Sequence, residues 1–306
     1  MLGIALAGGG AKGGAHAGVL AALEEHRLKP SVITGTSSGS IIAALYACGY
    51  SPGEIKCILG QFVNGHNESC GTCSCSQKIQ TLIDFDYPGI FKMLLNGLFL
   101  KYPALQGFLK GEKLHRMLAG LFLEKGVINI SDVKMPLAMP AVDLMSGKTV
   151  YFSNIEFAPG VITDVPLASA VSASCAFPSV FRPRKLGNML MVDGGLTDNL
   201  PVEILPSLGA DFTMAVELGV QKDFSRANHK NFINIADRCI DILRIDVEQT
   251  HSDQIGYLLN IGITDTSLLE LKNLLYCCKK GYDACLAEID SIKAALQASS
   301  ALQAKN

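Results

Sequence analysis

The sequence Ser31-Val-Ile-Thr-Gly-Thr-Ser-Ser-Gly-Ser-Ile-Ile-Ala-Ala-Leu-Tyr46 decides which fold this chain can adopt. A short β-prone run precedes the pattern Gly-x-Ser-x-Gly at positions 35–39, and apolar residues at helical spacing follow it. Strand, glycine-flanked turn and helix form the context that a nucleophile elbow requires. Gly35 and Gly39 allow a strained turn and a close approach of neighbouring strands. We therefore expect Ser37 to lie clear of a sheet, at the positive end of a helix dipole.

The same stretch has a simpler interpretation. Glycine and serine are common residues, and a serine-rich turn that only caps a helix has the same composition. The strand–turn–helix context favours the elbow but does not exclude the cap. Two further glycine motifs along the chain distinguish the two interpretations.

Length and composition limit the class of protein. The chain has 306 residues, of which 49% are hydrophobic and 18% charged, with a net charge of −2. No break in composition separates its predicted elements, so we expect one α/β domain over residues 1–306. The small net charge gives no reason to expect a nucleic-acid partner. We expect no cofactor, and the sequence does not indicate an oligomeric state.

The location of the protein follows from what its sequence lacks. No apolar run reaches the ~18 residues that span a bilayer, and the N-terminus has no basic segment typical of a signal peptide. We therefore expect a cytoplasmic protein, with peripheral membrane association left open. Five scattered cysteines lie in apolar or helical surroundings, where we expect reduced core thiols. They are Cys48, Cys57, Cys175, Cys239 and Cys285.

A second glycine motif follows the first predicted strand. Residues 2–7 run into Gly8-Gly-Gly-Ala-Lys-Gly-Gly14, and a helix is predicted over 15–26. Such a loop exposes backbone N–H groups to an anion. Gly8, Gly10 and Gly13 have the spacing of a dinucleotide fingerprint, but the next strand ends at Gly35 without the acidic residue that a ribose requires. We favour the alternative, in which the loop stabilises a transient oxyanion.

Two groups of possible ligands or bases have no clear motif. His16 is a candidate base for Ser37, although packing against the first turn of its own helix explains it equally well. His66, Cys70, Cys73 and Cys75 place four soft ligands within ten residues, which could bind zinc. Their spacing is tighter than in ordinary zinc modules, so we expect loop thiols and no metal.

The middle and the end of the chain are expected to be helical. Residues 63–125 are rich in Leu, Phe, Met and Tyr and are interrupted by Pro and Gly, which predicts short amphipathic helices. These helices either cover the core or form a lid-like, lipid-facing region. Residues 212–218 are predicted as the last strand. Residues 267–304 are predicted as C-terminal helices, with Leu268, Leu271, Leu274 and Leu275 on one face.

A third glycine motif supplies a candidate acid. Residues 189–192 read as a strand that ends in Asp193-Gly194-Gly195. An aspartate at a strand end with two glycines behind it lies at the edge of the sheet, although a simple Asp turn is an alternative. Asp198 is a second candidate acid, but it stands in the following loop.

Three motifs thus occur in a fixed order, Gly-Gly-Gly-Ala-Lys-Gly, Gly-Thr-Ser-Ser-Gly and Asp-Gly-Gly, and together they resemble the patatin-like phospholipase family. The stretches at 173–183 and 198–201 resemble that family as well, and the resemblance spans residues 1 to about 285. It implies a three-layer α/β/α sandwich with a mainly parallel sheet. It also implies a dyad of Ser37 and Asp193, with Gly9 and Gly10 in the oxyanion loop and Lys12 at its basic position.

The expected activity follows from this resemblance. It implies hydrolysis of carboxylic esters in phospholipids or related acyl lipids, through an acyl-enzyme. An acyltransferase that uses the same dyad and a non-catalytic lipid-binding module are the alternatives. Since no histidine carries a motif, we expect Asp193 to activate Ser37 directly.

Overall fold

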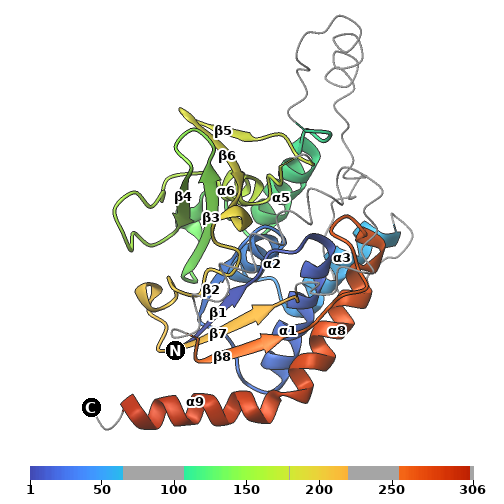
Figure 1. Ribbon diagram of the computed structural model, residues 1–306, viewed down its shortest axis with the longest axis vertical. Coiled ribbons are helices and arrows are strands. Elements are labelled where there is room, and N and C mark those ends of the chain that lie inside the picture. Colours follow the sequence, from blue (N-terminus) through green and yellow to red (C-terminus); the bar gives the residue numbers. More distant parts are fainter. Residues whose placement is uncertain (65–106, 179, 220–254, 304–306) are drawn as a thin grey trace, which may run out of the picture.

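The computed structural model describes residues 1–64, 107–178, 180–219 and 255–303. Within these residues, eight strands form a mixed sheet in the order β5-β6-β3-β2-β1-β7-β8, and β4 pairs with β3 (Figure 1). The strands are β1 (Leu2–Leu6), β2 (Val32–Gly35), β3 (Leu137–Asp143), β4 (Lys148–Ser153), β5 (Arg184–Leu186), β6 (Met189–Asp193), β7 (Phe212–Glu217) and β8 (Tyr257–Asn260). Neighbours from β3 to β8 along this order are parallel. The pairs β3–β4, β3–β6 and β5–β6 are antiparallel.

Helices lie on both sides of this sheet. The α-helices are α1 (Gly14–Glu25), α2 (Ser38–Ala47), α3 (Pro52–Asn64), α5 (Glu112–Glu124), α6 (Leu167–Ser174), α8 (Leu274–Ala287) and α9 (Ile289–Gln303). Short 3₁₀ helices are η1 (Gly10–Gly13), η3 (Ile130–Asp132), η4 (Gly194–Leu196), η5 (Pro206–Leu208) and η8 (Leu271–Asn273). The expected α/β sandwich with a mainly parallel central sheet is therefore confirmed.

The two faces of the sheet bury side chains of different size. Because side chains alternate along a strand, Ile4 and Leu6 of β1 point to one face and Ala5 points to the other. The larger side chains pack under α1, α2 and α3. The smaller ones pack under the chain around η5, which includes Val202 and Leu205. Small side chains let this covering segment lie close to the sheet.

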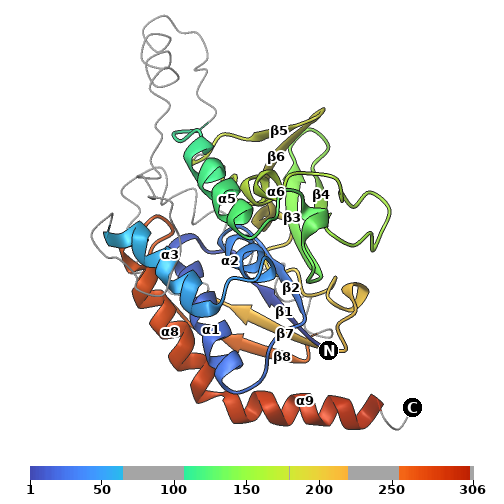
Figure 2. The same ribbon diagram turned by 180° about the vertical axis from the view of Figure 1, so that it is seen from behind.

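Glycines set the contact between α1 and α8. A methyl group at Gly18 would overlap the carbonyl oxygen of Cys278, and one at Gly281 would overlap that of Ala15. The two helices therefore approach until their backbones touch, which only glycine permits. The view from behind in Figure 2 shows α8 lying along α1. This contact brings the C-terminal part of the chain beside the glycine loop.

Most predicted elements occur near their predicted positions. At the start of α3, the Ser51 amide donates to Glu54 Oε2 at 2.7 Å and the Glu54 amide donates back to Ser51 Oγ at 3.2 Å. This reciprocal pair is a capping box. Residues 212–218 are not the last strand, since β8 follows. β8 was missed because it has only four residues, and glycines at 256 and 262 flank it.

The predicted C-terminal helix starts later than its leucine spacing suggests. Helix α8 begins at Leu274, and Leu268 and Leu271 lie before it rather than on its face. A hydrogen bond from the Ala11 amide to the Leu268 carbonyl, 2.8 Å long, holds this segment in a turn. A second break near Glu288 separates α8 from α9.

Other predictions concern cysteines and membranes. Cys48, Cys175 and Cys285 are free thiols. Cys57 is disulfide-bonded, so that prediction was wrong; the residue lies on a half-exposed side of α3 rather than in the core. Cys239 lies outside the described residues, as do most of the amphipathic stretch at 63–125 and the four candidate zinc ligands at 66–75. No helix among the described residues has the length and hydrophobicity to cross a bilayer.

Candidate active site

Ser37 lies on a strained turn between β2 and α2. Its backbone has φ 52° and ψ −121°, which a residue with a side chain rarely adopts. It is the N-cap of α2, so its hydroxyl lies at the positive end of that helix. A methyl group at Gly35 would collide with the backbone of Gly39, and one at Gly39 would overlap the Leu6 carbonyl. The turn therefore requires the glycines that flank Ser37 in the sequence.

Ser37 and Asp193 are in direct contact. The Ser37 hydroxyl donates a hydrogen bond of 2.6 Å to Oδ2 of Asp193. Asp193 is only 1% exposed, at the end of β6. The Gly195 amide donates to its other oxygen, Oδ1, at 2.8 Å. One carboxylate oxygen is thus oriented by the backbone, and the other faces the serine hydroxyl.

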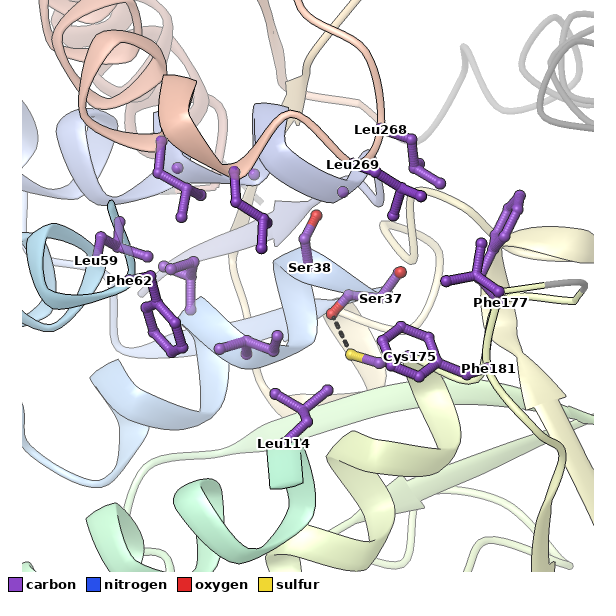
Figure 3. A pocket seen from close by; sticks show the side chains of 18 of the residues that line it. Ser37, Ser38, Leu59, Phe62, Leu114, Cys175, Phe177, Phe181, Leu268 and Leu269 are labelled. Atoms are coloured by element: carbon purple, nitrogen blue, oxygen red, sulfur yellow. Dashed lines mark hydrogen bonds between the residues drawn. The ribbon is translucent and has the colours of Figure 1, made fainter. Parts of the chain in front are cut away.

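The end of α6 holds the backbone of Ser37 from both sides. The Ser37 amide donates to Ser174 Oγ at 3.1 Å. The Ser37 carbonyl accepts from Ser40 Oγ at 2.6 Å and from Cys175 Sγ at 3.1 Å, the contact drawn as a dashed line in Figure 3. Burial raises the pKa of the Cys175 thiol, so the thiol keeps the proton that it donates. These bonds offset the cost of the strained turn.

The glycine loop approaches the same serine, but its amides differ in availability. The Gly8 amide donates to the Asn199 carbonyl, and the Gly9 amide donates to Ser38 Oγ, both at 3.1 Å. Within the described residues we find no acceptor for the amides of Gly10 and Ser38, which are the first residues of η1 and α2. These two N–H groups are therefore the ones free to bind an anion beside Ser37.

The remaining residues of the predicted loop have structural contacts. The Lys12 ammonium donates to the Gly219 carbonyl at 3.3 Å, and Lys12 is not among the residues that line the cavity beside Ser37. Gly13 faces Ser38, whose side chain would overlap a methyl group at position 13. Likewise, a methyl group at Gly194 would overlap the Pro140 carbonyl. These glycines allow the loops to pack together.

His16 does not contact the dyad. The imidazole is fully buried on α1, and its Nε2–H donates to the Ala7 carbonyl at 2.8 Å. Among the residues that the structure describes, its Nδ1 has no hydrogen-bond partner. Burial lowers the pKa of His16 to about 4, so the ring is neutral at physiological pH. This placement agrees with a packing role for His16, whereas the carboxylate of Asp193 contacts Ser37.

The alternative acid and the dinucleotide interpretation also lose support. Asp198 Oδ2 accepts from the Tyr151 hydroxyl at 2.8 Å, and its carbonyl accepts from Thr36 Oγ1 at 2.9 Å. Asp198 therefore fixes its loop to β4 and to Thr36, the residue that follows β2. Beside Gly10, the position where a methyl group would sit is already occupied by Leu268. No cluster of potential metal ligands occurs in the part of the chain that the structure describes.

An apolar cavity of about 180 Å³ opens beside Ser37 (Figure 3). The cavity reaches the amide loop at Gly10 and the hydroxyls of Ser37 and Ser38. Hydrocarbon side chains from five segments form its walls, as expected of a site for an apolar ligand. They include Ile41, Ile42, Leu59, Phe62, Leu109, Leu114, Met117, Phe177, Val180, Phe181, Leu268, Leu269, Leu271 and Leu274.

Sequence reasoning missed several residues of this site. The Ser38 amide could have been expected, because the residue after an elbow nucleophile commonly donates to the oxyanion. Ser174 and Cys175 belong to a stretch that matched the family, but nothing in their spacing indicated that they hold Ser37. Leu268 was assigned to a helix face and instead lies over the glycine loop.

Comparison with known proteins places this geometry in context. A family model described as patatin-like phospholipase matches residues 4–206. The protein YqhO of Bacillus subtilis is 32% identical over 201 residues, which are 64% of this chain and 63% of YqhO. Lysophospholipase NTE1 of Coccidioides immitis is 29% identical over 222 residues, which are 72% of this chain and 12% of that protein. This chain thus spans less than two thirds of the length of either relative.

One solved structure supports the fold. VipD from Legionella pneumophila superimposes with a TM-score of 0.50 at 16% sequence identity, covering 95% of this chain and 66% of VipD. At that identity the likeness concerns the fold alone.

Proposed function

This chain belongs to the patatin-like phospholipase family, and we propose that it is a serine hydrolase of acyl lipids. The observation that carries the proposal is the 2.6 Å hydrogen bond from Ser37 Oγ to Asp193 Oδ2, at the end of an apolar cavity. A relative carries the name lysophospholipase. Phospholipids and lysophospholipids are therefore the substrates that we propose first.

The reaction begins with transfer of the Ser37 proton to Asp193. A serine hydroxyl is a weak nucleophile until a neighbour accepts its proton, and a carboxylate in a buried site is a better acceptor than one in water. Ser37 Oγ then bonds to the ester carbonyl carbon, and the carbonyl oxygen becomes an oxyanion. We assign its stabilisation to the amides of Gly10 and Ser38, where one such donor contributes about 10²–10³-fold to rate.

The tetrahedral intermediate collapses with cleavage of the ester C–O bond. Asp193 returns the proton to the leaving alcohol, and the acyl group stays on Ser37 Oγ. Water then transfers a proton to Asp193 and attacks the acyl carbon. Ser37 regains its proton as the fatty acid leaves. The acyl chain lies in the apolar cavity throughout, against its hydrocarbon walls.

The test is hydrolysis of lysophosphatidylcholine and of a short nitrophenyl ester by the wild-type protein and by Ser37→Ala. We expect the variant to lose release of fatty acid and of nitrophenol while it keeps the wild-type circular dichroism spectrum. Hydrolysis by Ser37→Ala at the wild-type rate would remove Ser37 from the mechanism. Acyl transfer to added alcohols that exceeds hydrolysis would identify a transferase instead.

A further inference from the structure

A turn of leucines stands at the rim of the cavity. We call residues 268–271, between β8 and α8, the leucine turn; it lies outside the matched residues 4–206. Leu268 is its inner residue, because its carbonyl accepts the Ala11 amide at 2.8 Å and its side chain lies against Gly10. Figure 3 shows Leu268 and Leu269 on the side of the cavity that faces Ser37 and Ser38.

The leucine turn is closed by a local hydrogen bond at its start and packed against α1 at its end. Before it, the Ser267 amide donates to Glu270 Oε2 at 3.1 Å. After it, the backbone of Leu274 packs against Gly14 of α1. The turn is therefore held in place beside the glycine loop, and its outward side chains are held with it.

Two of its leucines face both the cavity and the solvent. Leu269 and Leu271 line the cavity, yet they are 45% and 36% exposed. Scattered exposed leucines are ordinary, but an exposed apolar rim that is continuous with a binding cavity marks an interaction site. Because the rim is continuous with the cavity, the partner that covers the rim also lies beside the path by which an acyl chain enters. This position restricts the kind of partner that fits.

We propose that the leucine turn is the contact of this protein with a phospholipid bilayer. Leu269 and Leu271 insert among the acyl chains of the bilayer. A substrate chain can then pass from the bilayer into the cavity along these two side chains without crossing water. The proposal depends on the proposed lipid substrate of the same cavity. Lys272 beside the turn lies 3.4 Å from a Glu270 oxygen. Because Glu270 offsets the charge of Lys272, the turn favours a zwitterionic lipid surface over an anionic one.

The first experiment measures partitioning onto phosphatidylcholine vesicles by flotation. A double variant, Leu269→Gln with Leu271→Gln, should bind about tenfold more weakly, since each of these partly exposed leucines would contribute about threefold on insertion. The matched control is Leu258→Gln with Leu286→Gln. These leucines are 45% and 40% exposed but do not line the cavity, and their replacement should leave partitioning unchanged.

A second measurement covers the case in which the double variant does not fold. The chain has no tryptophan, so Leu269→Trp is a unique fluorescent reporter, with Leu286→Trp as its control. Vesicles should shift the emission of Leu269→Trp to the blue, and nitroxide-labelled lipids should quench it. The control should show neither change. Absence of wild-type binding, equal weakening of both double variants, or equal quenching of both reporters would overturn the proposal.

This test is separate from that of the proposed function. Flotation and fluorescence do not require turnover, and both can be measured in the Ser37→Ala background. If Ser37 proves unnecessary for hydrolysis but the leucine-dependent contact with vesicles is observed, the hydrolase proposal fails and the lipid-binding surface remains. Hydrolysis of the soluble ester without leucine-dependent vesicle contact would leave the hydrolase and remove the surface.

Discussion

The two sides of the cavity are built by different kinds of contact. On the reactive side, hydrogen bonds of 2.6–3.1 Å fix Ser37 to Asp193, Ser174 and Cys175. On the apolar side, the leucine turn is delivered by the close packing of α8 on α1. The first side lies within the region that matches the family, whereas the leucine turn lies beyond it. The proposed chemistry thus depends on short sequence motifs, whereas the proposed contact with the lipid depends on long-range packing.

The reactive side is most sharply tested at its base. Asp193→Asn keeps the size of the side chain but removes the proton acceptor, so we expect kcat for ester hydrolysis to fall about 10²–10⁴-fold. Asp198→Asn is the matched control, because its oxygen still accepts from the Tyr151 hydroxyl, whereas the Ser37 hydroxyl donates to Asp193. Equal losses in both variants would show that the Ser37–Asp193 contact has no special role.

The buried histidine should affect stability rather than catalysis. Because the pKa of His16 is about 4 when folded and 6.5 when unfolded, the unfolded chain binds an extra proton between these values. The stabilising effect of the neutral ring is complete above pH 6.5 and is lost as the pH falls to 4. It amounts to about 3 kcal/mol in the free energy of unfolding.

His16→Gln removes this titration. Denaturant unfolding at pH 7.0 and pH 4.5 should therefore show a smaller difference for the variant than for the wild type, and ester hydrolysis should persist. A variant that folds but has lost hydrolysis would instead indicate a conventional triad.

The packing side is tested at the contact between α1 and α8. Gly18→Ala places a methyl group on the Cys278 carbonyl, and the overlap should lower the free energy of unfolding by about 2 kcal/mol. Gly60→Ala in α3 is the matched control, since its methyl group would lie 3.8 Å from the nearest atom of Leu275. It should raise stability by up to about 1 kcal/mol through helix propensity. If both variants lose the same free energy of unfolding, the loss does not come from the contact between α1 and α8.

The contact between Ser37 and Asp193 could be predicted from sequence because each residue is placed by a local motif. A strand, a glycine turn and a helix place Ser37, and a strand followed by two glycines places Asp193. Parallel pairing of β1 and β2 then brings the glycine loop and the elbow to one edge. The motifs did not specify which backbone amides of the glycine loop can bind an anion. The Gly8 and Gly9 amides donate to Asn199 and Ser38, and these acceptors lie outside the loop motif.

The apolar side could not be predicted in the same way. Leucines at 268, 271, 274 and 275 have helical spacing, but that spacing is equally compatible with a turn followed by a helix. The Leu268 carbonyl accepts an amide from residue 11, far away in sequence. Only the folded chain brings these two groups together. The strand β8 was missed for a similar reason. Its four residues form a strand because they pair with β7, and their own sequence has no clear strand pattern.

The reactivity of the Ser37 hydroxyl can be measured without knowledge of the natural substrate. The wild-type protein is incubated with a fluorophosphonate, digested, and mapped by mass spectrometry. The account predicts one adduct on Ser37, formed much more slowly in Asp193→Asn. An unmodified Ser37, or an adduct that forms equally fast without the carboxylate, would contradict it.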